Sequence, residues 1–245
     1  MTAALVTGGG RGLGAAIAGR LADEGFAVVV GDIDGEAAAD TAASITETGG
    51  EAVAVEADVA SDGAADTLVD RAVSEYGCLD VLVNNAAIET VAPALELTDD
   101  EWERVRSVNL DAVFRLSRAA GRRFREQGDG GDIVNITSFH DTWPRTGKIH
   151  YDTAKAGVWM LTKDFALELA EHGVAVNCIA PGVMATPMNE ALQNDPEAMA
   201  EQRERIPWGR LGDPEEVADA VAFLIDSNYI TGVRLPVDGG VSLVG

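Results

Sequence analysis

Four polar side chains, Asn109, Ser138, Tyr151 and Lys155, have the types and spacing needed to move a proton to or from an alcohol. A helix would place the Tyr151 phenol and the Lys155 ammonium one turn apart on the same face. A phenol has a pKa of about 10, and a nearby positive charge would lower that pKa enough to make Tyr151 a usable acid and base. Ser138 ends a predicted strand and could hold the substrate oxygen during the exchange. Asn109 lies in a helical region, where we expect its amide to order another group, such as a water beside Lys155.

A glycine-rich loop follows the first predicted strand. It reads Thr7-Gly8-Gly9-Gly10-Arg11-Gly12-Leu13-Gly14 and leads directly into a helical pattern. Glycines permit a tight turn and a close approach of the backbone, so a dinucleotide pyrophosphate can rest on the N-terminus of the helix. The loop therefore predicts a cofactor site with contacts from Gly8, Arg11, Gly12, Leu13 and Gly14.

The acidic end of the second predicted strand indicates which dinucleotide is expected. Asp32, with Ile33 beside it, follows Gly14 by eighteen residues and can accept hydrogen bonds from the adenosine ribose. Its carboxylate would repel a 2′-phosphate, which favours NAD over NADP. Arg11 favours NADP instead, because an arginine in the loop could bind that phosphate. We give Asp32 more weight and interpret the nearby Asp34-Gly35 as a turn.

Together these residues predict hydride transfer between a nicotinamide and an alcohol or ketone carbon. The alcohol would bind between Ser138 and Tyr151 and lose its proton to Tyr151, while Lys155 and the positive nicotinamide steady the tyrosinate. No metal is required. A non-catalytic nucleotide sensor is a second reading, although it has little reason to retain all four polar residues. An epimerase or dehydratase using NAD transiently is a third, although such proteins usually carry a larger carboxyl-terminal domain.

Short apolar runs alternate with amphipathic segments along the chain, which is typical of a doubly wound α/β domain with helices on both faces of a parallel sheet. Strands are predicted over Ala3–Thr7, Ala27–Asp32, Ala52–Ala57, Val81–Asn84, Asp132–Thr137, Val174–Ile179 and Val233–Val237. Helices are predicted over Gly12–Glu24, Gly63–Tyr76, Asp99–Arg125, Tyr151–His172 and Pro214–Leu224. Residues 1–245 are interpreted as one domain, and the irregular stretch at about 183–208 as a substrate lid.

The composition argues against several classes of protein. The chain has 41 acidic and 18 basic residues and a net charge of −23, a field that repels nucleic acid. The acidity is typical of a high-salt cytoplasm, and also of proteins from GC-rich mesophiles. No long apolar run or signal peptide is evident, so we expect a cytoplasmic protein without membrane contact. Cys78 and Cys178 are expected to be reduced thiols, and no spacing indicates a metal site.

These residues resemble the short-chain dehydrogenase/reductase family along essentially the whole chain. The resemblance implies a Rossmann-type sheet of seven strands, usually in a homotetramer, and a catalytic tetrad of Asn109, Ser138, Tyr151 and Lys155. The family's Asn-Asn-Ala-Gly signature appears as Asn84-Asn85-Ala86-Ala87, a departure at the last position that we expect to be tolerated. Asp238-Gly239-Gly240 matches a carboxyl-terminal signature. Further cofactor contacts implied by the family are Asp58, Val59, Asn85, Ala86, Ala87, Tyr151, Lys155, Pro181, Gly182, Val183 and Thr186.

Within the family the sequence is most similar to bacterial glucose 1-dehydrogenases, notably around Ser138-Phe139-His140-Asp141 and Ile206-Pro207-Trp208-Gly209-Arg210. That similarity implies an aldose oxidised at C1, for which fixed polar groups are needed. Candidates for such groups are Glu89, His140, Asp141, Arg145, His150 and Asn189, and His140 is preferred because it follows Ser138. An apolar wall would favour a cyclic ketone, a steroid or a 3-oxoacyl substrate instead. Candidates for that wall are Trp143, Met184, Met188 and Trp208.

Overall fold

The computed structural model describes residues 2–244, which contain a sheet of seven parallel strands in the order β3-β2-β1-β4-β5-β6-β7. This confirms the predicted doubly wound architecture. The strands run over Ala3–Thr7 (β1), Ala27–Asp32 (β2), Glu51–Glu56 (β3), Val81–Asn84 (β4), Gly131–Ile136 (β5), Val174–Pro181 (β6) and Arg234–Val237 (β7). The order reverses between β1 and β4, so the two strands lie side by side and their carboxyl ends open a crevice there.

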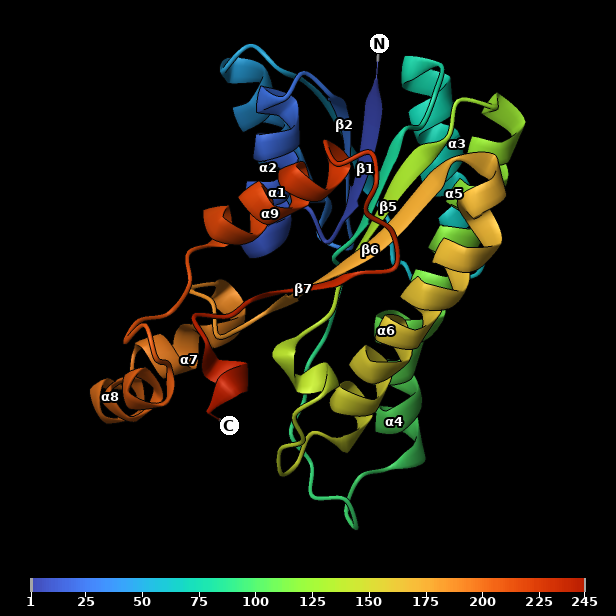
Figure 1. Cartoon of the computed structure of the whole chain (residues 1–245). Helices are drawn as coiled ribbons and strands as arrows, with labels where there is room; N and C mark the ends of the chain where they lie inside the picture. The colour runs from blue at the N-terminus through green and yellow to red at the C-terminus, as the bar shows by residue number, and fades with distance from the viewer. Residues whose placement is uncertain (1, 245) are drawn as a thin grey trace.

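Helices cover both faces of the sheet (Figure 1). One face is packed by α1 (Gly12–Asp23), α2 (Gly35–Glu47) and α9 (Pro214–Ile225), and the other by α3 (Ala64–Tyr76), α5 (Ala112–Gln127) and α6 (Ile149–Leu169). Shorter helices are α4 (Asp99–Arg106), α7 (Glu190–Gln193) and α8 (Pro196–Arg205). None of the helices in residues 2–244 is long and apolar enough to cross a membrane.

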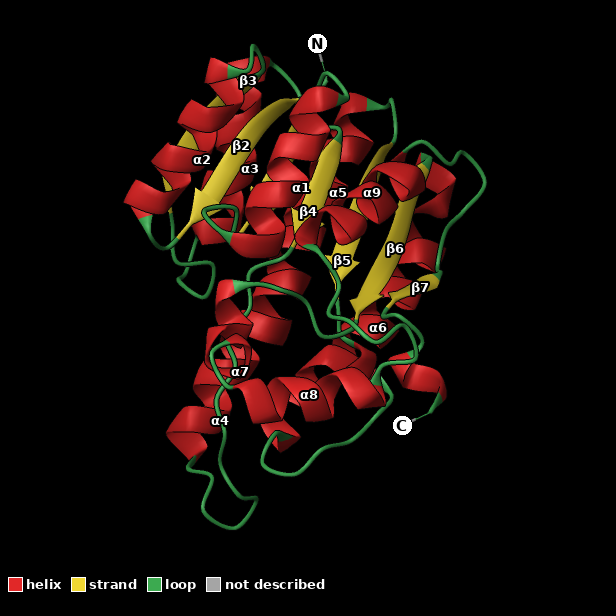
Figure 2. Ribbon diagram, turned by 90° about the vertical axis from the view of Figure 1, so that its left-hand side faces the viewer, coloured by secondary structure: helices red, strands yellow, loops and turns green. Residues whose placement is uncertain are grey.

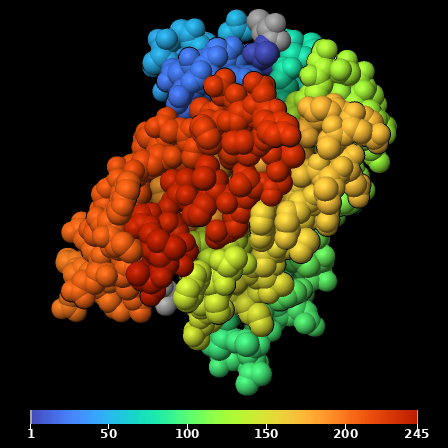
Figure 3. Space-filling model, in the orientation of Figure 1, coloured from blue at the N-terminus to red at the C-terminus, as the bar shows by residue number. Residues whose placement is uncertain are grey.

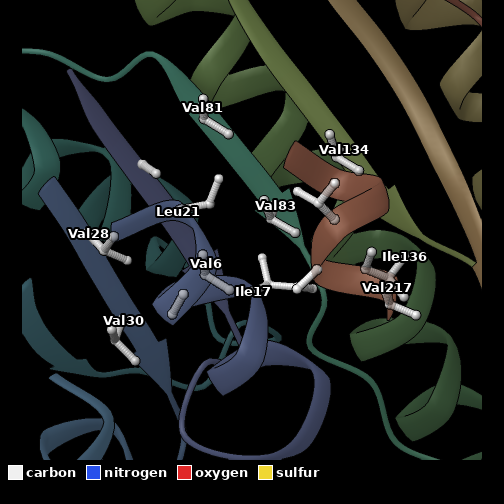
Figure 4. Close-up of a cluster of buried hydrophobic side chains, with 14 of the residues drawn as sticks. Val6, Ile17, Leu21, Val28, Val30, Val81, Val83, Val134, Ile136 and Val217 are labelled. Carbon is white, nitrogen blue, oxygen red and sulfur yellow. The ribbon is translucent and has the colours of Figure 1, made fainter. Parts of the chain in front are cut away.

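The strands carry apolar side chains on both faces because both faces are covered. Val6, Val28 and Val83 pack against Ile17 of α1 and Val217 of α9 on one face (Figure 4). On the other face, a second cluster includes Leu5, Val29 and Leu82. The two layers hold the strand ends rigidly, and these ends position the site described below.

Two helical predictions were wrong in detail. Asp34-Gly35 is not merely a turn, because Asp34 caps α2 and its side chain accepts a hydrogen bond from the Ala37 N–H. An aspartate cap before an alanine-rich run is the signal that could have found this helix. The predicted helix Asp99–Arg125 is interrupted by a π-helical turn over Ser107–Asp111. Hydrophobic spacing alone does not reveal such a turn, which is frequent at functional sites.

The segment 183–208 is more regular than predicted. It contains α7 and α8, which lie beyond the carboxyl ends of the strands together with α4 (Figure 2). Asp195 caps α8 and Pro196 is its first residue. A stretch that was predicted to be irregular therefore contains the start of a helix. The carboxyl-terminal segment, red in Figure 3, packs beside this region and near residues 140–150, where the Trp143 indole N–H donates to the Ser242 carbonyl oxygen at 3.0 Å.

Asp132, the second residue of β5, makes stability depend on pH. Burial raises the pKa of its carboxyl to about 7, so the folded chain binds a proton that the unfolded chain releases at about pH 4. This contribution to stability is complete below about pH 4 and is lost as the pH rises through 7. Asp132→Asn should therefore increase the free energy of unfolding by about 2 kcal/mol more at pH 8 than at pH 5. Urea unfolding at both pH values measures this, with the exposed Asp129→Asn as a control that should show no such difference.

Candidate active site

A cavity of about 820 Å³ runs along the carboxyl ends of the strands, from Asp32 at one end to Tyr151 at the other. Its volume lies in the range of about 300–1,000 Å³ that is typical of small-molecule sites. Most predicted cofactor residues line it, namely Gly8, Arg11, Gly12, Leu13, Asp32, Ile33, Asp58, Val59, Asn85, Ala86, Ala87, Tyr151, Lys155, Pro181, Gly182, Val183 and Thr186. Gly14 is not among the lining residues.

The glycine loop is shaped by close backbone contacts with the β4 end. Gly8 has φ +62°, and a Cβ there would lie 2.8 Å from the Ala86 Cα. Asn85 clamps the loop, because its side-chain amide donates to the Thr7 and Gly8 carbonyl oxygens at 3.0 and 2.9 Å. Gly14 lies beneath this clamp, where a Cβ would come within 1.9 Å of the Gly8 oxygen. Gly14 therefore serves the packing of the loop on α1, and the cradle suits a pyrophosphate.

The Asp32 end of the cavity is held by backbone hydrogen bonds. The Asp32 carboxylate accepts the Gly10 N–H at 2.9 Å and the Asp34 N–H at 3.0 Å, and the residue is 8% exposed. Arg11 forms an ion pair with Asp34, which also lines the cavity. The guanidinium considered as a phosphate ligand is thus engaged by a carboxylate that sequence reasoning had assigned only to a turn.

Ser138, Tyr151 and Lys155 meet at the other end of the cavity, and all three line it. Ser138 follows β5, and its hydroxyl oxygen accepts the His140 N–H at 3.2 Å, while Ser138 also acts to lower the pKa of the Tyr151 phenol. The Lys155 ammonium donates to the Ile136 carbonyl oxygen at 2.8 Å, and its Nζ lies 5.7 Å from the Tyr151 ring centroid. Placing both side chains on one face of α6 brings them together as predicted.

The predicted lowering of the Tyr151 pKa by Lys155 is not seen in this structure. Burial raises the pKa of the Tyr151 phenol, Glu89 raises it further, and the opposing groups are Arg145 and Ser138. Burial also lowers the pKa of Lys155 to about 8. A phenolate and an ammonium both lose hydration in this closed environment, and that loss exceeds their attraction. An additional positive charge in the cavity would lower the Tyr151 pKa.

Asn109 is fully buried in the π-helical turn and does not line the cavity. Its side-chain amide donates to the Ile88 carbonyl oxygen at 2.8 Å, and its side-chain oxygen accepts the Ile88 N–H at 2.9 Å. The paired amide fixes the backbone that follows β4, including the lining residues Ala87, Ile88 and Glu89. Because Ile88 lies on a different segment, and sequence patterns do not show the π-helical turn, this arrangement could not be predicted.

A buried polar network ties the elements beneath the site together. The Asn84 amide donates to the Asn135 side-chain oxygen at 2.8 Å, and the Asn135 amide donates to the Thr162 hydroxyl at 2.9 Å. These residues join β4, β5 and α6, the three elements that carry the clamp, Ser138 and Tyr151. Sequence reasoning had not singled out Asn135 or Thr162, although a polar residue within an apolar strand is a usable signal.

The substrate end of the cavity contains some, but not all, of the predicted residues. Glu89, His140, Met184, Met188, Arg145 and Asn189 line it. Trp143 and His150, expected to reach the substrate, lie outside the lining. Trp143 packs toward Ser242, and His150 is 2% exposed with its Nε2 2.7 Å from the Thr90 hydroxyl. Adjacent helical residues point about 100° apart, so His150 cannot share the direction of Tyr151. Asp141 and Trp208 also fall outside this cavity.

The polar groups at this end form an ionic cluster. Arg145 contacts Glu89 at 3.0 Å and Asp152 at 3.4 Å, and Lys148 also pairs with Glu89. His140 has its Nδ1 2.9 Å from the Trp143 carbonyl oxygen, and burial lowers its pKa.

Several residues that line the cavity were not predicted from the sequence. They are Asp34, Ala57, Ile88, Thr90, Arg104, Val108, Ile136, Thr137, Phe139 and Pro187. Within residues 2–244, no group of three or more His, Cys, Asp or Glu side chains is arranged to hold a metal ion.

The chain is similar to known proteins along almost its whole length. The family model described as enoyl-(acyl carrier protein) reductase matches residues 8–242. The 3beta-hydroxysteroid dehydrogenase 1 of Eggerthella lenta is 45% identical over 242 residues, which cover 98% of this chain and 93% of that protein. Glucose 1-dehydrogenase 2 of Bacillus subtilis is 39% identical over 244 residues, which cover 98% and 94%.

The chain belongs to the short-chain dehydrogenase/reductase family. The predicted family membership is therefore confirmed. A solved structure from Agrobacterium tumefaciens, assigned as a 2-deoxy-D-gluconate 3-dehydrogenase with bound NADP, has a TM-score of 0.91 at 38% identity and covers 98% of this chain and 96% of that one. As a short-chain dehydrogenase/reductase, the protein is an oxidoreductase of alcohol or ketone substrates, and its family binds NAD(P).

Proposed function

We propose that this short-chain dehydrogenase/reductase interconverts a secondary alcohol on an apolar ring and the corresponding ketone, with NAD as its cofactor. The observation that carries the proposal is the single cavity shared by Asp32, Ser138, Tyr151 and Lys155. A dinucleotide long enough to reach from the acidic strand end to the phenol would put its reactive ring beside the substrate hydroxyl.

Each catalytic side chain has a distinct part in the proposed reaction. The Ser138 hydroxyl holds the substrate oxygen, and Tyr151 accepts the proton from that oxygen. Lys155, anchored on the Ile136 carbonyl, orients the cofactor ribose and contributes positive charge. Asn109 acts through Ile88, because its two hydrogen bonds to Ile88 fix the backbone that follows β4. When bound, the nicotinamide supplies the hydride acceptor, and its positive charge is the additional one that the buried Tyr151 needs.

The preference for NAD is supported by the carboxylates at the adenosine end. Asp32 is held by two backbone N–H groups with its charge facing the cavity, where a ribose can donate to it. Its charge would oppose a 2′-phosphate. The bound NADP in the Agrobacterium structure belongs to that protein, and the pairing of Arg11 with Asp34 argues against the same cofactor here.

An apolar ring substrate is supported by the way the polar candidates are engaged. Glu89 is paired with Arg145 and Lys148, and the Asn189 amide donates to the Met184 carbonyl oxygen at 2.9 Å. The lining at this end includes the apolar side chains of Ile88, Val108, Phe139, Val183, Met184 and Met188. The similarity to a 3beta-hydroxysteroid dehydrogenase agrees with this choice.

An aldose oxidised at C1 is the second candidate, and His140 favours it. With Nδ1–H directed to the Trp143 carbonyl, the ring keeps Nε2 as an acceptor for a hydroxyl. The similarity to a glucose 1-dehydrogenase supports the same candidate. Glu89 could add further acceptor oxygens at the cavity wall.

NADH formation from NAD⁺, followed by ultraviolet absorbance with hydroxysteroids, cyclic alcohols and aldoses, tests the proposal. We expect the highest kcat/KM with an apolar ring alcohol and NAD⁺. Activity with aldoses alone would replace the first candidate by the second. Binding of NADH without turnover on any alcohol or ketone would contradict an enzymatic role and support a nucleotide sensor.

We also propose a homotetramer, which needs two separate interfaces in each subunit. Two groups of the exposed apolar side chains lie on the outer helices, with Phe114, Met160 and Leu167 on α5 and α6, and Phe223 and Tyr229 on and after α9. Light scattering during size-exclusion chromatography tests this assembly, and a monomeric mass would contradict it.

A further inference from the structure

The ion pair between Arg11 and Asp34 joins two elements at the adenosine end of the cavity. Arg11 is the residue before α1, and Asp34 is the residue before α2. Both line the cavity, and their side chains are 57% and 44% exposed. The pair therefore lies where solvent or a ligand can reach it, unlike the shielded Asp32 beside it.

Asp34 is itself held in place by its neighbours. One carboxylate oxygen accepts the Ala37 N–H at 3.1 Å and caps α2, while the other contacts the Arg11 guanidinium. Its own N–H donates to the Asp32 carboxylate at 3.0 Å. The hydrogen bond from Ala37 lowers the pKa of Asp34, so the carboxyl is ionised at neutral pH. A flexible arginine is thus paired with a carboxylate whose position the backbone determines.

We propose that Asp34 is a specificity-determining residue that holds the Arg11 guanidinium away from a phosphate on the adenosine ribose. This inference rests on the proposed preference for NAD. Asp32 disfavours the phosphate by direct repulsion, and Asp34 removes the cation of the glycine loop that could compensate. The two carboxylates then act on NADP in different ways, one through the ligand and one through Arg11.

The effect of releasing Arg11 should be measurable but moderate. A guanidinium and a phosphate form charge-assisted hydrogen bonds, often two in parallel. The competing pair with Asp34 is exposed to solvent and therefore weak. We expect release of Arg11 to tighten NADPH binding about threefold while leaving NADH binding nearly unchanged. Asp32 would still repel the phosphate, so NADH should remain the better ligand or become nearly equal.

Asp34→Asn is the appropriate variant, because asparagine keeps an oxygen that can cap α2 and removes the charge that holds Arg11. The full chain would be titrated with NADH and NADPH, following nucleotide fluorescence to obtain each Kd. Arg11→Met and the double variant Asp34→Asn with Arg11→Met complete a cycle. The exposed Glu36→Gln, in the first turn of the same helix, controls for the loss of one negative charge.

The expected result is an about threefold lower Kd for NADPH in Asp34→Asn, most of which disappears in the double variant, with no change in Glu36→Gln. An equal gain in the single and double variants would overturn the role of Arg11, because only repulsion would have been relieved. No gain in Asp34→Asn, with a wild type that prefers NADH, would overturn the inference alone. A wild type that binds NADPH more tightly than NADH would overturn the proposed NAD preference and the inference with it.

Discussion

Replacement of Tyr151 by phenylalanine should lower kcat about a thousandfold or more, because it removes the proton acceptor without changing the ring. Tyr151 is 6% exposed and lines the cavity together with Ser138. Phenylalanine fills the same volume, so we expect the cavity to keep its shape and the Kd for NADH to change less than threefold, roughly. Steady-state turnover of the best ring alcohol and a fluorescence titration with NADH measure the two quantities.

Tyr76→Phe is the matched control for this variant. It removes the same hydroxyl from a half-buried tyrosine at the end of α3 that does not line the cavity, and kcat should not change. If Tyr151→Phe kept a tenth or more of the wild-type activity, roughly, Tyr151 could not be the main proton acceptor. A large loss of NADH affinity would instead show that the hydroxyl serves binding.

Replacement of Gly14 by alanine should destabilise the protein by about 3 kcal/mol or more, a large effect for one methyl group. The new Cβ would lie 1.9 Å from the Gly8 carbonyl oxygen and 2.6 Å from the Asn85 side-chain nitrogen. The loop would have to move away from α1, and the Asn85 clamp would move with it. We therefore expect weakened NADH binding as well as a lower free energy of unfolding in urea.

Gly19→Ala provides the comparison, because Gly19 lies in the same helix and a Cβ there meets no atom within 4 Å. Alanine has the higher helix propensity, so this variant should gain about 0.5–1 kcal/mol. Equal effects at the two positions would mean that the close contact beneath the glycine loop does not determine its stability.

The Rossmann-type architecture could be predicted because each of its strands and most of its helices have a recognisable pattern within their own segment of the sequence. Apolar runs such as Val28-Val29-Val30 and the alternation with helical spacing indicate a parallel sheet without knowledge of strand order. The exceptions were α2, α7 and α8. Only the capping residues Asp34 and Asp195 marked the starts of α2 and α8.

The contacts within the candidate site could be predicted less completely than the fold. Tyr151 and Lys155 are related by the period of one helix, so their proximity follows from spacing alone. The partners of Asn109 and Arg11, in contrast, are Ile88 and Asp34, which lie on different segments. Sequence proximity also misled for His150 and Trp143, which neighbour catalytic residues but point elsewhere.

The sequence by itself determined the family, the fold and the chemistry, because motifs and hydrophobic periods are local properties of the chain. The tertiary structure decided how the charges are paired and how strongly burial acts on them. It raises the pKa of Tyr151, lowers that of Lys155 to about 8, and pairs Arg11 with Asp34. Desolvation and ion pairing depend on which segments meet in space, and that information exists only once the sheet has brought its strand ends together.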